Sequence, residues 1–212
     1  MTTEYEIEPI KGLPGNLPRG ESIVWQGSPD WRGLARGVFH TRLVAIWFGL
    51  VAMLAFVAGG TGLTGAVVTL GVAGLGLAIL AGLAWAQART TVYTLTEKRL
   101  VMRFGIALPK CINLPLSLVA SADLRPVGTH YVDIVLALNG RFPLGWLQMW
   151  PHVRPWKLAV PQPMLRAVPD SLVAVLAETL ADADPGRLRA VARPIASSKA
   201  DIPAHQPIGV AA

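Results

Sequence analysis

The longest run without a charged side chain limits the possible folds of this chain more than any other feature. Arg42 and Arg89 are consecutive charged residues, so the 46 positions between them carry no charge. A helix that crosses the hydrocarbon core of a bilayer needs about 20 apolar residues. The run is therefore long enough for two spans, and Gly59-Gly60-Thr61-Gly62 marks the turn between them. We expect helices over residues 43–58 and 63–87.

Composition favours a membrane hairpin over the alternative, a buried helical hairpin in a soluble protein. The 212 residues are 52% hydrophobic and only 15% charged, whereas an average soluble domain has about 25% charged residues. The first helix is slightly short for a span, and Val38 and Phe39 could extend its entrance.

Basic residues flank the run on both sides and are absent from its central turn. They are Arg32, Arg36 and Arg42 before the first helix, and Arg89, Lys98, Arg99 and Arg103 after the second. Because Lys and Arg are enriched in cytoplasmic loops, both ends of the hairpin, and both termini, are expected in the cytoplasm. Trp47 follows Arg42 and Trp85 precedes Arg89 within five residues, where indoles favour the membrane interface. We predict that Arg42, Trp47, Trp85 and Arg89 anchor the hairpin there.

Small residues recur at every fourth position of the second helix. They are Gly74, Ala78, Gly82 and Ala86. Such a stripe lets another helix approach closely. Two interpretations stay open: the stripe packs against the first helix, or it receives a span of a partner or of a second copy of this chain.

After the hairpin, alternation of apolar and polar residues replaces the uniform apolar run. Strands are expected over "TVYTLT" (91–96), "RLVMRFG" (99–105), "LSLVASADL" (116–124) and "HYVDIVLALNG" (130–140). In the second of these, Leu100, Met102 and Phe104 share one face. Asn139-Gly140 predicts a hairpin turn. A third span over residues 131–150 is disfavoured, because this stretch contains an acid, a base and a turn.

An amphipathic helix over residues 170–183 follows, with its apolar stripe at Leu172, Val173, Leu176 and Leu180. The predicted divisions are a cytoplasmic N-terminal segment (1–42), a transmembrane hairpin (43–88), a cytoplasmic domain (89–184) and a disordered tail (185–212). The expected fold class is an α+β membrane protein, in which the hairpin precedes a small antiparallel β-barrel closed by a C-terminal helix.

The segment from Trp146 to Pro169 combines three Trp residues with five Pro residues. Pro keeps the backbone extended and lowers the entropy lost on docking. Because Trp and Arg are enriched among binding hot spots, the candidate partner or membrane surface is Trp146, Trp150, Arg154, Trp156 and Lys157. Three interpretations stay open: these Trp side chains fill the barrel core, contact a partner protein, or lie among lipid headgroups.

No arrangement of catalytic residues is recognisable, so we expect neither enzymatic activity nor a cofactor. The four His residues have no Cys or acidic neighbour at metal-ligand spacing, so no metal site is expected. His40, at the entrance of the first helix, could ligate the magnesium of a chlorin, but contact with headgroups is favoured. The single Cys111 is expected to be inert.

The stretch from Arg89 to Arg166 carries ten bases and three acids. A domain of this charge, tethered beneath an anionic leaflet, is drawn towards it, so membrane lipid is an expected partner. No nucleic-acid-binding module is recognised, and nucleic acid is not an expected partner.

The run "YTLTEKRLVMRFGI" resembles the opening strands of bacterial pleckstrin-homology-like domains, which often follow paired membrane helices. The blocks "GLPGNLPRGESIVWQGSPDWRGLARGVFHTRLVAIWF" and "WPHVRPWKLAVPQPMLRAVPDSL", together with the two spans, are similar to the photosynthetic complex assembly proteins of purple bacteria, the PuhB family. The resemblance covers nearly the whole chain except the tail.

This resemblance implies a non-catalytic factor of the bacterial inner (intracytoplasmic) membrane. Such a factor helps the photosynthetic reaction centre and its core antenna, light-harvesting complex 1, to assemble, and their subunits are the implied partners. The alternative is a membrane-tethered pleckstrin-homology-like domain that binds lipid or organises other membrane proteins.

Overall fold

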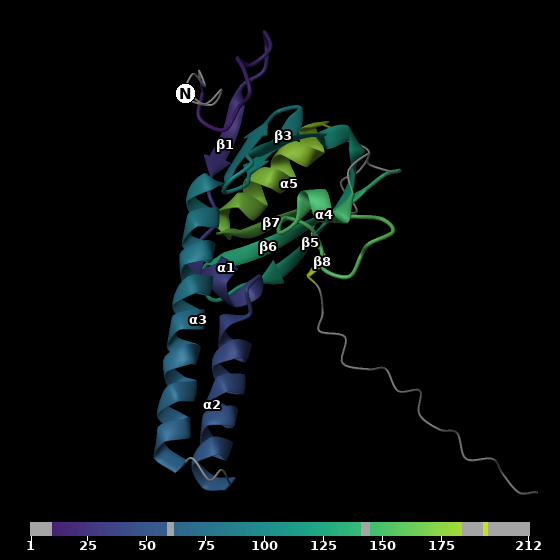
Figure 1. The fold of residues 1–212 in the computed structure, drawn as a ribbon. Coiled ribbons are helices and arrows are strands. Elements are labelled where there is room, and N and C mark those ends of the chain that lie inside the picture. Colours follow the sequence, from purple (N-terminus) through teal and green to yellow (C-terminus); the bar gives the residue numbers. More distant parts are fainter. Residues whose placement is uncertain (1–9, 59–61, 141–144, 184–192, 195–212) are drawn as a thin grey trace, which may run out of the picture.

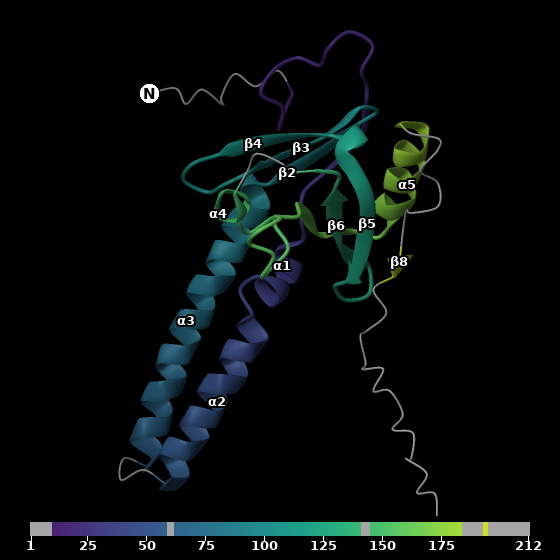
Figure 2. The same cartoon turned by 90° about the vertical axis from the view of Figure 1, so that its right-hand side faces the viewer.

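The computed structural model describes residues 10–58, 62–140 and 145–183, and the backbone of residues 193 and 194. Two helices, α2 (Thr41–Ala58) and α3 (Gly62–Thr90), lie side by side and project from a domain of strands (Figures 1 and 2). Both predicted helices are thus present, and each is slightly longer than expected. The expected turn at 59–61 and the expected disordered tail, except residues 193 and 194, lie outside the described residues.

Apolar side chains cover the outside of the two helices. α3 is long and apolar enough to cross a membrane. α2 reaches the same length and hydropathy only together with α1 (Trp31–Gly37), and the two then form one span that is bent by 54°. The buried residues between α2 and α3 are mostly small, with Ala52 on one helix and Ala66 and Ala73 on the other. The large side chains point outwards instead.

The short helix α1 was not predicted from the sequence. It begins after Asp30, whose side chain accepts a hydrogen bond from the Gly33 backbone N–H at 2.8 Å. Leu34 and Ala35 pack against Ala84 and Ala88 of α3, so α1 contacts the domain end of the hairpin. A Cβ at Gly33 would lie 2.4 Å from the Ala167 Cβ, so only glycine permits this close approach of α1 to the domain.

The domain contains two four-stranded sheets. One has the order β1 (Ile23–Gly27), β2 (Val92–Thr96), β3 (Arg99–Phe104) and β4 (Lys110–Pro115). The other has the order β7 (Met164–Pro169), β6 (Tyr131–Leu138), β5 (Val119–Pro126) and β8 (Arg193–Pro194). The connecting pieces are a 3₁₀ turn at Leu116–Leu118 and α4 (Trp146–Met149), and the chain then forms α5 (Ser171–Ala183).

The expected closed barrel is not found. Among the described residues no strand pairing joins the two sheets, and all pairs are antiparallel except β5 with β8. The chain leaves β4 through the 3₁₀ turn, where the Leu116 backbone N–H donates to the Lys98 carbonyl at 3.0 Å. This turn interrupts the strand expected over 116–124, so β4 and β5 belong to different sheets.

Residues before the hairpin contribute to the same domain. β1 pairs with β2 across the whole hairpin sequence, so the expected division at residue 42 is not an edge of the folded unit. The buried carboxylate of Glu21 accepts hydrogen bonds from Arg99 Nη2 and Thr96 Oγ1, both at 2.6 Å. The Arg99 guanidinium lowers the pKa of Glu21, so this N-terminal contact is strongest above the usual pKa of a carboxyl group.

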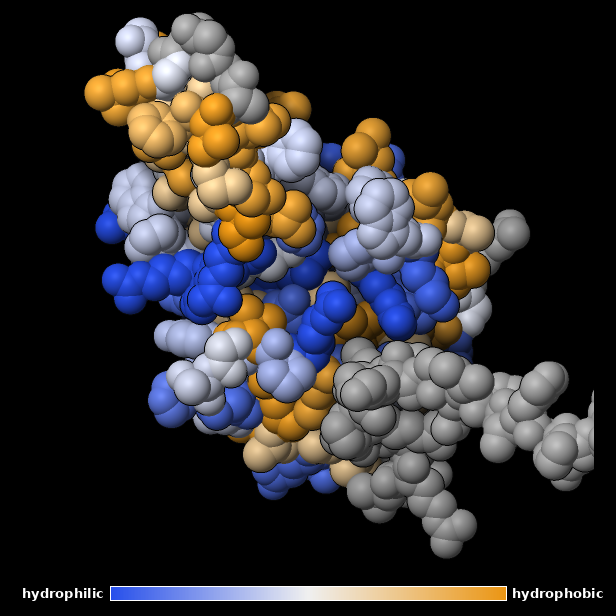
Figure 3. Space-filling view, turned by 90° about the horizontal axis from the view of Figure 1, so that it is seen from below, coloured by the Kyte–Doolittle hydropathy of each residue, from blue (hydrophilic) through white to orange (hydrophobic). Residues whose placement is uncertain are grey.

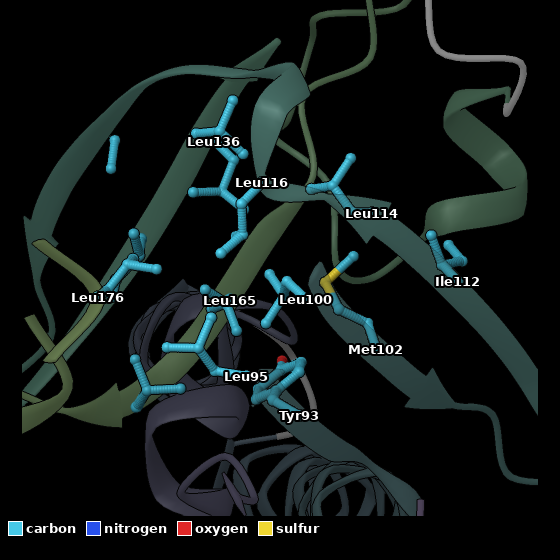
Figure 4. Close-up of a cluster of buried hydrophobic side chains, with 14 of the residues drawn as sticks. Tyr93, Leu95, Leu100, Met102, Ile112, Leu114, Leu116, Leu136, Leu165 and Leu176 are labelled. Carbon is cyan, nitrogen blue, oxygen red and sulfur yellow. The ribbon is translucent and has the colours of Figure 1, made fainter. Parts of the chain in front are cut away.

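The main core lies between the two sheets and α5 (Figure 4). Leu100, Met102 and Phe104 of β3 all point into it, as their alternation predicts. Leu172 and Leu176 contribute the apolar face of α5, and this helix begins one residue later than expected. The α+β class with antiparallel sheets and a C-terminal helix is therefore confirmed.

Candidate interaction surface beside the hairpin

The Trp-rich segment forms α4 and then a loop with a closed base. The Val153 and Pro163 backbones form a bridge, and the Arg154 N–H donates to the Gln162 carbonyl at 2.9 Å. The loop between these positions is therefore held at both ends, while its tip projects from the domain. The last part of the segment is not a loop, because it continues as β7.

The three Trp side chains have three different environments. Trp146 packs against the main core, and its indole N–H donates to the Arg154 carbonyl at 3.0 Å. Trp150 is 48% exposed and meets the Phe39 ring edge-on at 6.4 Å. Trp156 is 92% exposed and has φ 63°, a backbone conformation that is rare for a bulky residue. The core interpretation therefore fits Trp146 and the surface interpretation fits Trp156.

Arg154 has a structural contact in addition to its position on the candidate surface. Its guanidinium lies 3.7 Å from the Asp123 carboxylate of β5 and 3.1 Å from the Gln162 amide oxygen. These contacts hold the loop against the second sheet. Lys157, next to Trp156, is exposed.

Further apolar side chains surround Trp156 in sequence and are also exposed. They are Leu147, Leu158 and Val160. Several exposed large apolar side chains in one short segment are typical of a binding site for protein or membrane. The Trp and basic residues of this surface were predictable from the sequence, but these aliphatic residues were not among the predicted ones.

Buried residues of the Trp-rich segment take part in a polar network where α3 meets the domain. The His152 ring is fully buried, with Nδ1 2.6 Å from Tyr93 Oη and Nε2 3.2 Å from Gln87 Nε2. Tyr93 Oη also accepts from the Arg166 backbone N–H at 3.1 Å, so its own hydrogen is free to donate to Nδ1. Burial lowers the pKa of His152 to about 3 and raises that of Tyr93, so both are neutral at pH 7.

The adjacent ion pair joins the same segment to the second sheet. Arg166 Nη1 lies 3.1 Å from Asp133 Oδ2, and both side chains are buried. Arg166 also donates to the carbonyls of Pro151 and Val153, and Asp133 Oδ1 accepts from the Ala167 N–H at 2.7 Å. Every polar group of this pair therefore has a partner. Nothing in the local sequence indicated this network, because its members come from separate strands and loops.

The predicted interfacial anchors lie on the surface of the hairpin. Trp47 and Trp85 are exposed, and the Arg89 guanidinium lies 4.7 Å from the Trp85 ring centroid. Arg42 is exposed at the start of α2. Their depth relative to a bilayer stays a prediction.

The small-residue stripe does not pack against α2. Gly74, Ala78 and Gly82 are exposed, and a Cβ added at either glycine would meet nothing within 4 Å. The reason is that Ala73 and Ala66, on a different face of α3, are the buried residues of this helix pair. Of the two interpretations, contact with α2 is wrong. The use of the stripe, including the half-buried Ala86, by another helix stays a prediction.

The described residues contain no group of three or more His, Cys, Asp or Glu side chains that could hold a metal ion. His40 is exposed and has φ 49° at the bend between α1 and α2. Arg36, Arg42 and Arg125 line the same cavity as His40.

The fold defines a class of protein in which a two-sheet domain with a C-terminal helix is attached to a helical hairpin. The chain belongs to the family whose model is described as the bacterial PH (pleckstrin-homology) domain, which matches residues 42–183. The chain is also 34% identical to an uncharacterised 23.7 kDa protein in the puhA 5′ region of Rhodobacter capsulatus, over 79% of this chain and 82% of that protein. These matches agree with the PuhB-family resemblance. No solved structure matches significantly.

Proposed function

We propose that this protein is a non-catalytic, membrane-anchored assembly factor for the photosynthetic reaction centre and its core antenna. α2 and α3 span the bacterial inner membrane with both chain termini in the cytoplasm. The Trp-rich surface of the domain then contacts the cytoplasmic face of the partner subunits. The observation that carries the proposal is the exposed Trp156 loop beside the hairpin.

The position of this loop supports a partner that is itself in the membrane. Trp156 and Pro155 line the same cavity as Gly37 and His40, at the bend that precedes α2. Trp150 contacts Phe39 in the same region. If α2 enters the bilayer near Arg42, the loop lies close to the cytoplasmic interface. A membrane subunit that packs beside the hairpin would reach it.

The gene neighbourhood of the relative supports the photosynthetic role. The Rhodobacter capsulatus protein is encoded in the 5′ region of puhA, a photosynthesis gene. Genes for an assembly factor and for its target are often adjacent, so this position favours the proposal over a general membrane function.

Purification from native membranes tests the partner. The full-length chain, tagged after Ala183, is extracted in a mild detergent from cells grown phototrophically. We expect reaction-centre and core antenna subunits among the co-purified proteins, and Trp156→Ala to reduce them while membrane abundance stays normal. Recovery of lipid alone, or of membrane proteins unrelated to photosynthesis, would favour the alternative of a general lipid-binding or organising domain.

Reporter fusions test the topology. A fusion at Gly60 should report the periplasm and a fusion after Ala183 the cytoplasm. Two cytoplasmic signals, with release of the protein by alkaline carbonate, would mean that the hairpin does not span the membrane.

A further inference from the structure

A basic cleft lies where the bend between α1 and α2 meets the second sheet. It consists of two adjoining cavities of about 340 and 360 Å³, which share Gly37, His40, Arg125 and Arg166. The basic side chains that line the two are Arg36, Arg42, Arg125, Arg154 and Arg166. In Figure 3, hydrophilic residues gather beside the apolar side chains of the hairpin on the underside of the molecule.

The positive charge of the cleft is only partly neutralised. Asp133 pairs with Arg166 at 3.1 Å, and Asp123 lies 3.7 Å from Arg154. In the part of the chain that the structure describes, no carboxylate pairs with Arg36, Arg42 or Arg125. Five arginines against two carboxylates leave a net charge of about +3 around one concave site, which favours an anion.

The geometry favours a phosphate group among the anions. Arg36 of α1, Arg42 of α2 and Arg125 of β5 line one cavity, and a guanidinium can donate two parallel hydrogen bonds to phosphate oxygens. Arg42, in the first turn of the 18-residue helix α2, lines the cleft, and the N-terminal end of a helix favours negative charge. Arg166 supplies a rigid wall, because Asp133 and two backbone carbonyls fix its guanidinium.

The surroundings indicate where such a phosphate comes from. Exposed apolar side chains begin immediately after the cleft, at Leu43, Ile46 and Trp47 of α2. Trp156 lines the adjoining cavity. A lipid with its phosphate in the cleft could lay its acyl chains along α2, a step that rests on the proposed membrane hairpin.

We infer that this cleft is a binding site for a phosphate group, supplied by the headgroup of an anionic membrane lipid. The bound headgroup bridges α1, the start of α2 and β5, and so fixes the angle between hairpin and domain. This site adjoins the Trp156 surface that the proposed function assigns to partner subunits, because Arg154 and Trp156 line one of its two cavities. Arg36 and Arg125, which the test below changes, are not part of that surface.

Lipid retention by the full-length protein tests the site. The detergent-purified chain is incubated with equal amounts of phosphatidylglycerol and phosphatidylcholine, washed, and its retained lipid is measured by mass spectrometry. We expect enrichment of phosphatidylglycerol. Arg36→Gln with Arg125→Gln should reduce this enrichment at least about tenfold, because each charge-assisted hydrogen bond contributes substantially to binding. Inorganic phosphate should displace the lipid from the wild type.

A charge-matched variant separates the cleft from general electrostatics. Arg32→Gln with Lys110→Gln removes the same charge from residues that do not line the cleft, and should retain phosphatidylglycerol like the wild type. The wild type could instead bind inorganic phosphate but not the lipid, with phosphate binding lost in the cleft variant. That result would confirm the phosphate site and show that its ligand is a soluble phosphate. Equal lipid loss in both variants, or an acidic peptide that binds through the cleft when phosphate does not, would overturn the inference.

This experiment is independent of the proposed function. If the hairpin proves not to span a membrane, the inorganic phosphate measurement still decides whether the cleft binds phosphate. If the cleft fails while Trp156→Ala still reduces the co-purified subunits, the assembly role remains and only the lipid site is lost.

Discussion

The hairpin and the domain place their apolar residues in opposite ways. In the domain, large side chains such as Tyr93, Phe104 and Leu136 are fully buried, and the buried polar groups beside them are hydrogen-bonded. In the hairpin, mainly alanines are buried, and Leu, Ile and Val side chains are exposed along both helices. A domain built in this way is stabilised by its own core in water. The hairpin needs an apolar environment or a partner to cover its surface.

The junction combines features of both regions. Gln87 in the last turn of α3 and Thr91 directly after the helix lie within hydrogen-bonding distance of the buried His152. Leu34 of α1 packs against the same helix. The hairpin is therefore attached to the domain by buried contacts on two sides, and a change in the domain core should alter how the hairpin is held.

The largest expected effect concerns the buried ion pair of the domain. Asp133→Ala would leave Arg166 charged and buried without its carboxylate, and the Ala167 N–H without its acceptor. Such a change typically costs about 3–5 kcal/mol of folding stability. Thermal unfolding of the detergent-purified protein should show the loss. Asp182→Ala on the exposed face of α5 is the control, and an equal effect of both variants would show that the pair is not structurally important.

Two Trp variants test whether the Trp-rich segment serves both the folding of the domain and the binding of a partner. Trp146→Ala should destabilise the fold, by no more than the about 3–5 kcal/mol typical of a fully buried Trp. Trp156→Ala should leave stability unchanged, since its side chain is 92% exposed. A hot-spot Trp typically contributes at least ~2 kcal/mol to partner binding. Membrane abundance and reaction-centre content, measured together, separate the two effects. Reduced abundance in the Trp156 variant would place this residue in the fold.

The buried His152 predicts how acid affects the junction. Its pKa is about 3 in the folded protein and 6.5 in an ordinary environment, so only the unfolded state takes up the proton between these values. This contribution to stability is complete above about pH 6.5 and falls by roughly 1.4 kcal/mol for each pH unit below it.

Unfolding of the full chain at pH 7, 6 and 5 measures this slope. His152→Gln is expected to lower the stability at pH 7 and to flatten the dependence between pH 7 and 5. An unchanged slope in that variant would assign the acid sensitivity to other groups.

The smallest expected effect concerns the outer face of α3. Gly74→Leu with Gly82→Leu should leave the hairpin itself intact, because a Cβ at either position meets nothing within 4 Å. Ala73→Leu is the matched control on the buried face and should disturb the α2–α3 contact. Crosslinking in membranes measures association with other helices. If the double glycine variant associates normally and supports normal assembly, the stripe has no partner.

The sequence indicated the hairpin reliably because its signal is local. An uncharged run of 46 residues can form few structures, and one Gly-rich break divides it into two helices. The strands β2, β3 and β6 and the helix α5 were also predictable, since the apolar residues of each recur with the period of a strand or a helix within a short stretch. The strands β1, β4 and β7 are short or bounded by Pro, and local alternation alone did not reveal them.

Only the tertiary structure decided how these pieces combine. Pairing of β1 with β2 across the hairpin depends on contacts between residues about 70 positions apart, and no local period encodes such a contact. The same holds for the buried His152, the Asp133–Arg166 pair and the basic cleft. Composition determined that one region of this protein is apolar throughout and another is basic. Long-range packing determined which Trp residue is core, which is surface, and where the arginines converge.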